Sequence, residues 1–373
     1  MALKTNSGEN CYSFLMTIMD YDLSVLLMNV ASRGGTDVHL MHGMAPVARI
    51  AGALGVLPYK PLSSDVIQEL LNPYMNETQR GIFQKENRVN CGHTIGEGRY
   101  RFNIYMALGM MGAAIRILPQ KTYPLSSLGL PPVVGTLAYR KSGIVFVTGP
   151  TGSGKSTTLA AMLDCINQDG RPSKIITIED PVETIFRPCH SVFVQREVGI
   201  DTPSFAMGIM DSIRQDPDIL CIGELRDEKS IYAAMTAAET GHLVLTTLHT
   251  RDAATAAQRL VSAVPACDQE TLRDQLASTL EAVISQELLP RADGKGVAVA
   301  CEVLVSTPAV RQMIRENKLE AINDVIQAGM KYGMISKDIA IKNLFAKGVI
   351  TREVAMEHMR HPENLTPAFT APA

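Results

Sequence analysis

The stretch GIVFVTGPTGSGKSTTLAAMLDCI, at residues 143–166, decides the fold class of this chain. Its first six residues form a largely apolar run without alternation, which is typical of a buried parallel strand. A glycine-rich turn follows, and the residues from 157 to 166 have helical character. A strand, a glycine-rich turn and a helix in this order predict an α/β domain built around a phosphate site.

The turn itself, GPTGSGKS at residues 149–156, fits the pattern G-x-x-x-x-G-K-[ST] in full. Glycines allow several backbone N–H groups to point at one anion, and the start of the helix adds its dipole. The lysine brings a point charge to the outer phosphates, and the serine hydroxyl can reach Mg²⁺. The predicted nucleotide-binding residues are Gly149, Pro150, Thr151, Gly152, Ser153, Gly154, Lys155, Ser156 and Thr157.

Ionisable side chains follow three further strand-like runs, at residues 174–178, 218–222 and 242–248. The carboxyl ends of parallel strands meet at one edge of a sheet, so these side chains should lie near the phosphate loop. We assign Glu224 as the carboxylate that activates water. Glu179 is expected to support the water and the Mg²⁺ ion, and His249 to contact the terminal phosphate.

Two domains and three connecting or terminal segments are expected along the chain. Helical and strand-like segments mix in the first domain, and a segment with four prolines separates it from the α/β pattern. A further strand is expected at residues 297–305, before a helical region. The division is a loose tail at 1–19, a small α+β domain at 20–118, a linker at 119–132, the α/β domain with C-terminal helices at 133–360, and a disordered end at 361–373.

The composition narrows the class of protein. The 373 residues are 46% hydrophobic, which excludes a disordered chain. The formal net charge is −3, so the chain has no overall positive charge that would indicate general binding of nucleic acid. The seven cysteines form no C-x-x-C pair, so no structural zinc site or redox motif is indicated. No apolar run is long enough to span a bilayer and no signal peptide is evident, so a cytoplasmic protein is expected.

The order of the motifs resembles the secretion-type hexameric ATPases, and among them the PilT-type retraction ATPases of type IV pili. Besides the phosphate loop, ITIEDPVE at 176–183 is similar to the acidic "Asp box" of that family. DPDILCIGELRD at 216–227 resembles its atypical Walker B motif, and GHLVLTTLHT at 241–250 its "His box". The resemblance extends over about residues 20–360.

Two features favour the retraction branch. PAVRQMIRE at 308–316 is similar to the C-terminal motif that the family ties to retraction, and the long N-terminal extension and four-cysteine zinc site of many assembly ATPases are missing. Two positions depart from the family pattern: Met210 stands where an arginine is usual, and Glu281, in a helix expected before Gln286, where a basic residue is usual. We expect these changes to affect subunit contacts or step efficiency and to leave the nucleotide chemistry in place.

The resemblance implies a RecA-like P-loop NTPase domain after a smaller PAS-like N-terminal domain, in a homohexamer that hydrolyses ATP with Mg²⁺. It also implies that Arg101 and Arg116, with Arg99 as a further candidate, reach the phosphates. The implied partners are an inner-membrane pilus platform protein and an accessory or assembly pilus ATPase, with no nucleic acid. The implied location is the cytoplasmic side of the inner membrane, by peripheral association with the pilus base.

Three alternatives stay open. One is a type IV secretion or conjugation ATPase, or a PilU-like accessory pilus ATPase with weak activity of its own. Another is a nucleotide-binding scaffold that does not hydrolyse ATP, against which Lys155, Ser156, Glu179 and Glu224 argue. A DNA or RNA translocase would need basic and aromatic side chains in line for strand stacking, and none line up.

Overall fold

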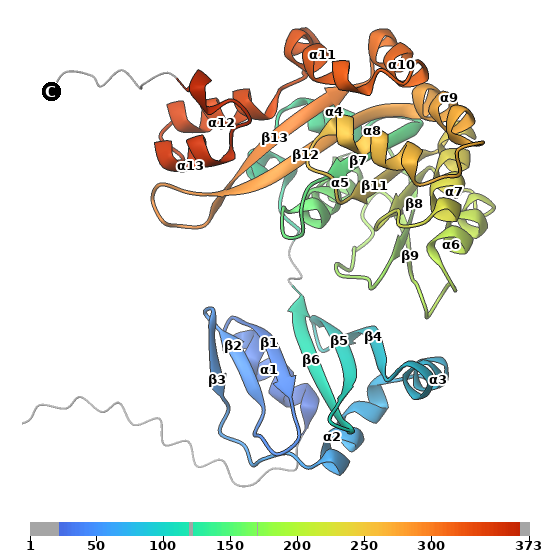
Figure 1. Cartoon of the computed structure of the whole chain (residues 1–373). Helices are drawn as coiled ribbons and strands as arrows, with labels where there is room; N and C mark the ends of the chain where they lie inside the picture. Colours follow the sequence, from blue (N-terminus) through green and yellow to red (C-terminus); the bar gives the residue numbers. More distant parts are fainter. Residues whose placement is uncertain (1–21, 119–121, 170, 366–373) are drawn as a thin grey trace, which may run out of the picture. The chain divides into compact units, whose positions relative to one another are not determined.

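The computed structural model describes residues 22–118, 122–169 and 171–365. The chain divides into two compact units, Met1–Leu118 and Pro119–Ala373 (Figure 1). The expected tail at 1–19, the first three residues of the expected linker and the last eight residues of the chain lie outside the described residues. In the part that the structure describes, no helix is long and apolar enough to cross a membrane.

The first unit contains an antiparallel sheet of six strands in the order β3-β2-β1-β6-β5-β4. Helix α1 begins directly after Asp22, whose carboxylate accepts the backbone N–H groups of Ser24 and Val25 and caps the helix. Strands β3 and β4 were not predicted from the sequence. The elements are α1 (Leu23–Ser32), β1 (Gly35–Leu40), β2 (Val47–Ile50), β3 (Ala53–Val56), α2 (Ser64–Leu71), η1 (Asn72–Tyr74), α3 (Glu77–Glu86), β4 (Arg88–Ile95), β5 (Gly98–Ala107) and β6 (Met110–Leu118).

Alternation along β5 separates the two faces of this sheet. Tyr100, Phe102 and Ile104 are buried and join the apolar side chains of α1 and α2 in one core. Arg101 therefore lies on the opposite face, where it pairs in register with Arg116 on β6. The sheet thus places two of the predicted phosphate-contacting arginines side by side.

The second unit contains a mixed sheet of seven strands in the order β13-β12-β7-β11-β10-β8-β9. The six strands from β12 to β9 run parallel, as predicted for the centre of the sheet, and β13 pairs antiparallel with β12. Strands β9 and β12 were not predicted. The strands are β7 (Gly143–Thr148), β8 (Lys174–Glu179), β9 (Val192–Glu197), β10 (Ile219–Ile222), β11 (Leu243–Leu248), β12 (Leu280–Pro290) and β13 (Val297–Val305).

Helices cover both faces of this sheet, which is why its central strands are buried and largely apolar (Figure 1). Helices α4 and α5 pack on one face, and α6, α7 and α8 on the other, so every residue of β7 and β11 is buried. The described part of the expected linker, residues 122–132, contains η2 (Leu125–Leu128), which packs against α5. The helices here are α4 (Val133–Ala138), α5 (Lys155–Asp169), α6 (Phe205–Ile213), α7 (Glu228–Glu239), α8 (Ala253–Ser262) and α9 (Gln269–Thr279).

The C-terminal region is helical, as expected, and its last two helices form a second core with the β12–β13 hairpin. Leu289 of β12 packs there with Ile341 and Leu365. The expectation that disorder begins at residue 361 is therefore wrong for residues 361–365, because Leu365 buries its side chain in this core. The elements are α10 (Pro308–Arg315), η3 (Leu319–Ala321), α11 (Ile322–Ala328), η4 (Met330–Tyr332), α12 (Lys337–Ala346), α13 (Arg352–His358) and η5 (Pro362–Asn364).

Candidate nucleotide site

The predicted phosphate loop joins the end of β7 to the first residue of α5, Lys155. Three glycines in it adopt positive φ: +145° at Gly149, +81° at Gly152 and +87° at Gly154. At Gly149 a Cβ atom would come within 2.4 Å of the carbonyl oxygen of Gln286 and of Oγ of Ser153. At Gly152 a Cβ would meet nothing within 4 Å. The first glycine is thus required for close packing, and the second only for its backbone conformation.

Lys155 is held inside this loop. Its Nζ donates to the backbone oxygens of Gly149 and Pro150, both at 2.9 Å. Burial lowers the pKa of the Lys155 ammonium below its ordinary value, and the negative charge of Glu224 partly opposes that effect. The lysine therefore stands at the loop as a desolvated cation, close enough to Glu224 to feel its charge.

The hydroxyl groups that border the loop are open. Thr151, Ser156 and Thr157 are exposed, and the Ser156 hydroxyl makes no hydrogen bond with another described residue. Among the described residues there is no cluster of three His, Cys, Asp or Glu side chains that could hold a metal ion. These residues could therefore hold Mg²⁺ only as enzymes that act on phosphates often do, with one protein hydroxyl, the phosphate oxygens of the substrate and water as its ligands.

Strand β12, which was not predicted, supports the loop from its side. Gln286 of β12, only 3% exposed, donates from Nε2 to the backbone oxygen of Ser153 at 2.8 Å. Next to it, Ser285 accepts a hydrogen bond of 2.8 Å from the hydroxyl of Thr148. The expected helix before Gln286 ends at Thr279, so the expectation that Glu281 lies in it is wrong: from Leu280 the chain is a strand that pairs with both β7 and β13. The Asp293-Gly294 dipeptide between two apolar runs was the available hairpin signal.

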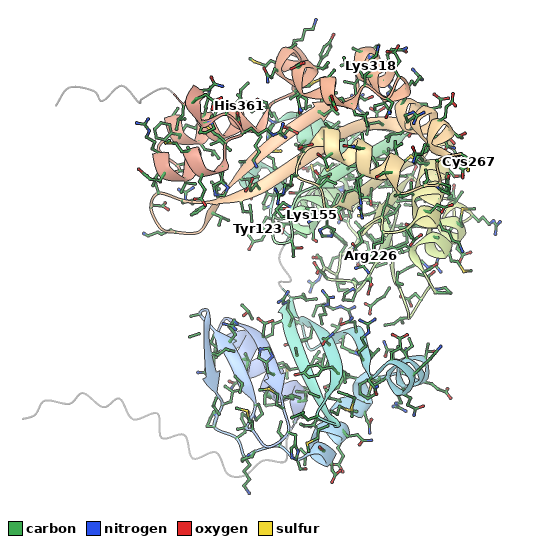
Figure 2. The ribbon with its side chains drawn as sticks, in the orientation of Figure 1. Tyr123, Lys155, Arg226, Cys267, Lys318 and His361 are labelled. Atoms are coloured by element: carbon green, nitrogen blue, oxygen red, sulfur yellow. The ribbon has the colours of Figure 1, made fainter. Side chains whose placement is uncertain are left out.

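Glu224, which follows β10, lies at the centre of a charge cluster. Its Oε1 accepts a hydrogen bond of 2.5 Å from Nη2 of Arg226, and its Oε2 lies 3.5 Å from Nε2 of His249. Burial by itself would raise the pKa of Glu224, but the hydrogen bond and charge of Arg226, with a contribution from His249, lower it overall. The carboxylate is therefore ionised and able to accept a proton. Figure 2 shows Arg226 and Lys155 in the second unit.

Glu179 occupies the end of β8, the strand next to β10. Its Oε1 accepts hydrogen bonds from the hydroxyl of Thr177 at 2.5 Å and from Nε2 of Gln195 at 3.4 Å. Burial raises the pKa of Glu179 despite these bonds. The neighbouring Asp180 lies 3.6 Å from Arg226, so Arg226 links the ends of β8 and β10. Arg226 was not predicted as a site residue, although it lies two residues from Glu224.

The structure therefore brings Glu179, Glu224 and His249 to one edge of the sheet, as their positions after three strands predicted. Strand β10 pairs in parallel with β8 on one side and with β11 on the other, and β11 pairs with β7, which leads into the phosphate loop. The loop, an ionised carboxylate and a histidine form an arrangement able to bind a nucleoside triphosphate and to activate water near its terminal phosphate.

The predicted arginines of the first unit differ in their surroundings. Arg116 donates from Nε to Oδ1 of Asp37 at 3.1 Å. Burial would raise the pKa of Asp37, but hydrogen bonds from Thr36 and Arg116 and the charge of Arg116 lower it overall. Arg101 has no ion pair or hydrogen bond to another described side chain, and Arg99 donates to the Thr94 hydroxyl at 3.4 Å.

The chain is similar to known proteins over most of its length. Residues 106–337 match the family described as type II/IV secretion system protein. Over 344 residues the chain is 40% identical to the type IV pilus retractation ATPase PilT of Pseudomonas aeruginosa, an overlap of 92% of this chain and 99% of that protein. The chain belongs to the PilT-like ATPases of the type II/IV secretion system protein family.

Two further relatives extend the comparison for this PilT-like ATPase. The type IV pilus ATPase PilU of Pseudomonas aeruginosa is 34% identical over 334 residues, 89% of this chain and 87% of that protein. A crystal structure of the pilus retraction motor PilT with bound ADP superposes with a TM-score of 0.84 at 39% identity and covers 92% of this chain and 99% of that one. The α/β fold, with its antiparallel first unit and mixed second sheet, thus matches a nucleotide-binding relative.

The two positions where this PilT-like chain departs from the family pattern lie in different settings. Glu281 is the second residue of β12 and forms ion pairs with Arg140 at 3.2 Å and with Arg311 of α10 at 3.4 Å. Met210 lies on α6 with 44% of its surface exposed. Glu281 therefore holds the helix that carries the C-terminal motif, and nothing in the structure explains Met210.

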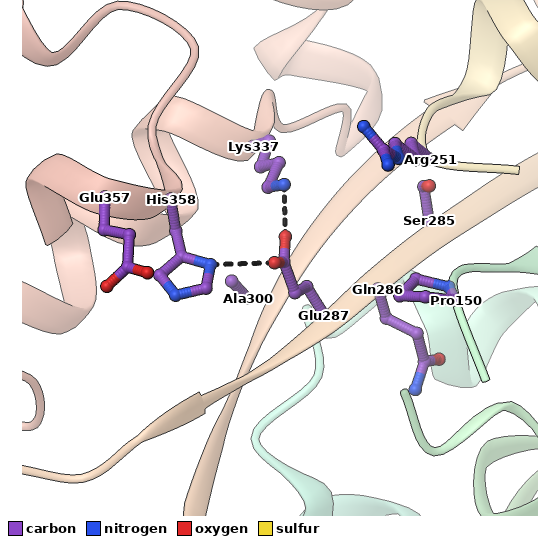
Figure 3. A pocket seen from close by; sticks show the side chains of 9 residues that line it. All are labelled: Pro150, Arg251, Ser285, Gln286, Glu287, Ala300, Lys337, Glu357 and His358. Atoms are coloured by element: carbon purple, nitrogen blue, oxygen red, sulfur yellow. Dashed lines mark hydrogen bonds and ion pairs between the residues drawn. The ribbon is translucent and has the colours of Figure 1, made fainter. Parts of the chain in front are cut away.

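A cavity of about 270 Å³ adjoins Pro150 of the loop (Figure 3). Inside it, Glu287 of β12 accepts from Nδ1 of His358 at 2.8 Å and forms an ion pair with Lys337. Burial would raise the pKa of Glu287, but these two partners lower it overall. The cavity is lined by Pro150, Arg251, Ser285, Gln286, Glu287, Ala300, Lys337, Glu357 and His358.

Proposed function

We propose that this chain hydrolyses ATP to power retraction of a type IV pilus, the motion that underlies twitching motility. The observation that carries the chemistry is the ionised Glu224, held by Arg226 and His249 beside the phosphate loop. The biological assignment is supported by the likeness to PilT over nearly the full length of both chains.

Each residue of the site has a role in the proposed reaction. Backbone N–H groups of the loop and the Lys155 ammonium bind the phosphates of ATP, and Lys155 exchanges its two backbone acceptors for phosphate oxygens. Glu224 orients the attacking water and accepts its proton. His249 positions the terminal phosphate, and Glu179 orients the water from the neighbouring strand.

The residues also fit a bound Mg²⁺ ion. The open hydroxyl of Ser156 would hold the ion together with phosphate oxygens and water, and Glu179 would support it through that water. When bound, Mg²⁺ supplies positive charge that neutralises the charge developing on the transferred phosphoryl group. Arg101 and Arg116 add further positive charge during turnover, and Arg101 is the better candidate because no described carboxylate neutralises it.

The finer features of the assignment follow from the family resemblance. We infer that the second unit is a RecA-like P-loop NTPase domain and the first a PAS-like domain, and that six copies form a ring. The proposed partners are the inner-membrane platform protein of the pilus and an accessory or assembly pilus ATPase. The proposed location is the cytoplasmic face of that membrane, at the pilus base.

A turnover assay tests the chemistry. Purified protein with Mg-ATP is expected to release phosphate, and Glu224→Gln or Lys155→Ala to reduce kcat by at least about 10²-fold. Glu69→Gln and Lys347→Ala change the same residue types at exposed positions and should keep full activity. Full turnover in Glu224→Gln would refute the assignment of the general base.

Deletion of the gene tests the biological role. We expect cells that carry excess surface pili and do not twitch, rescued by the wild-type gene and not by Glu224→Gln. A partial motility defect, with retained retraction, would instead favour a PilU-like accessory ATPase, for which the 34% identity to PilU is the supporting observation. Normal pili and motility would favour a secretion ATPase.

A further inference from the structure

Arg360, two residues beyond the end of α13, contacts two carboxylates from different elements. Its Nη2 lies 3.3 Å from Oδ2 of Asp252 and 3.2 Å from Oε2 of Glu302. The other oxygens of both carboxylates bind the start of α8: Oε1 of Glu302 accepts the backbone N–H of Ala253 at 3.0 Å, and Oδ1 of Asp252 accepts that of Thr255 at 2.7 Å. One guanidinium thus closes a cluster at the N-terminus of α8.

Charge compensation makes this cluster depend on Arg360. Glu302 is 1% exposed, and burial raises its pKa although Arg360 opposes the effect; the charge of Asp252 raises it further. Removal of Arg360 takes away the only ion pair that Asp252 forms with a described residue, so Oδ2 of this carboxylate is no longer held. Glu302 is fixed within β13, so the more exposed Asp252 is the carboxylate that would move.

Asp252 also lies between strand β11 and helix α8, close to the proposed catalytic residues in the sequence. It is the N-cap of α8 and the last residue of the turn 249–252, which leads from β11 into that helix. The first residue of this turn is His249, 3.5 Å from Glu224, and the third is Arg251, which lines the cavity beside Pro150. One four-residue turn therefore carries His249 at its start and Asp252 at its end.

Arg360 is itself firmly held. Its backbone N–H and that of His361 donate to the two oxygens of Asp338 at 2.8 and 3.0 Å. Its Nη1 donates to Oδ1 of Asn323 at 3.0 Å. The backbone at Arg360 is thus bound to α12 and its guanidinium to α11, which gives the side chain a defined geometry toward the turn.

We propose that Arg360 is a positioning residue for ATP hydrolysis, which through Asp252 and Glu302 fixes the turn 249–252 and hence the place of His249 beside Glu224. The inference rests on the proposed function, since it gives His249 a role at the terminal phosphate. The C-terminal helices then take part in the reaction without touching the nucleotide.

The first test compares Arg360→Gln with Arg352→Gln, which changes an exposed arginine of α13. We expect kcat to fall about tenfold in Arg360→Gln, while its affinity for a fluorescent ATP analogue stays within about twofold, because the phosphate loop is untouched. Arg352→Gln should match the wild type. An unchanged kcat in folded Arg360→Gln, or an equal loss of affinity and kcat, would overturn the proposal.

A double variant separates positioning from stability. Arg360→Gln with Glu302→Gln removes the buried carboxylate charge together with its partner, so the melting temperature should return close to the wild-type value. The kcat should stay low, because Asp252 still lacks its cation. Recovery of kcat together with stability would show that Arg360 only compensates charge, and would overturn the inference.

Hydrogen exchange gives a readout that does not depend on turnover. Amide exchange in a peptide covering residues 249–256 should be faster in Arg360→Gln than in the wild type and in Arg352→Gln. Unchanged exchange there would overturn the inference even for an inactive preparation. Failure of the wild type to release phosphate would contradict the proposed function instead.

Discussion

Nη2 of Arg226 donates a hydrogen bond of 2.5 Å to Oε1 of Glu224, two residues earlier in the chain. The same guanidinium lies 3.6 Å from Asp180 at the end of the neighbouring strand β8. Arg226 thus sets the ionisation of the proposed catalytic base and links it to the second acidic segment. This relationship makes the pH dependence of the reaction a test of the site.

Removal of Arg226 should move the acid side of the pH profile. Glu224 accepts a proton only while it is ionised, so activity falls as the pH drops through its pKa. In Arg226→Gln the effect of burial is no longer offset by the arginine, and the pKa of Glu224 rises. We expect the acid limb of kcat to move to higher pH, measured by phosphate release between about pH 4 and 9.

Arg259→Gln is the matched control, since it changes an exposed arginine in the last turn of α8. Its profile should coincide with that of the wild type. If Arg226→Gln also kept the wild-type profile, the guanidinium would not control the ionisation of Glu224 during turnover.

Two glycines of the phosphate loop should respond differently to the same substitution. Gly149→Ala places a Cβ within 2.4 Å of two atoms and should abolish binding of a fluorescent ADP analogue. Gly152→Ala meets open space and adds only the strain of a positive φ, about 1 kcal/mol. It should therefore bind with about a tenfold loss at most. Equal losses in both variants would argue against the packing of Gly149 on Gln286.

Gln286 should stabilise the loop from β12. Gln286→Ala removes the donor to the Ser153 carbonyl and leaves a cavity in a buried position, so we expect the free energy of unfolding to fall by about 1–3 kcal/mol. ADP should bind more weakly as well, as measured by calorimetry. Gln168→Ala changes an exposed glutamine of α5 and should alter neither quantity. Normal affinity in a folded Gln286→Ala protein would show that β12 does not hold the loop.

The two facing arginines of the first unit should contribute unequally to turnover. Arg101→Gln removes a guanidinium without a described acidic partner, whereas the charge of Arg116 is already paired with Asp37. We expect a reduction in kcat of about 10–10³-fold for Arg101→Gln and a smaller one for Arg116→Gln. Asp37→Asn, which frees Arg116, serves as the control for the pairing. A larger loss for Arg116→Gln would reverse this ranking.

Local sequence determined the phosphate site and much of the second unit. A loop of three glycines, a lysine and a serine between a buried strand and a helix leaves few alternatives, because the glycines allow the tight loop and the lysine and serine supply groups that phosphate binding needs. Glu179, Glu224 and His249 could also be predicted from the sequence. Each follows an apolar run within two residues, and the ends of parallel strands share one edge of the sheet. Long apolar runs report burial on both faces of a sheet without information from the rest of the chain.

Only the tertiary structure decided which partners these residues have. Strand β12 was not predicted because its apolar positions fit a helix as well as a strand. Only its pairing with β7 and β13 shows that it is a strand. The partners of Glu302 and Glu281 lie tens of residues away in sequence, so no local pattern reports them. Residue identity fixes which chemistry is available, whereas the pKa and position of a charged group depend on burial and on neighbours that folding brings from distant segments.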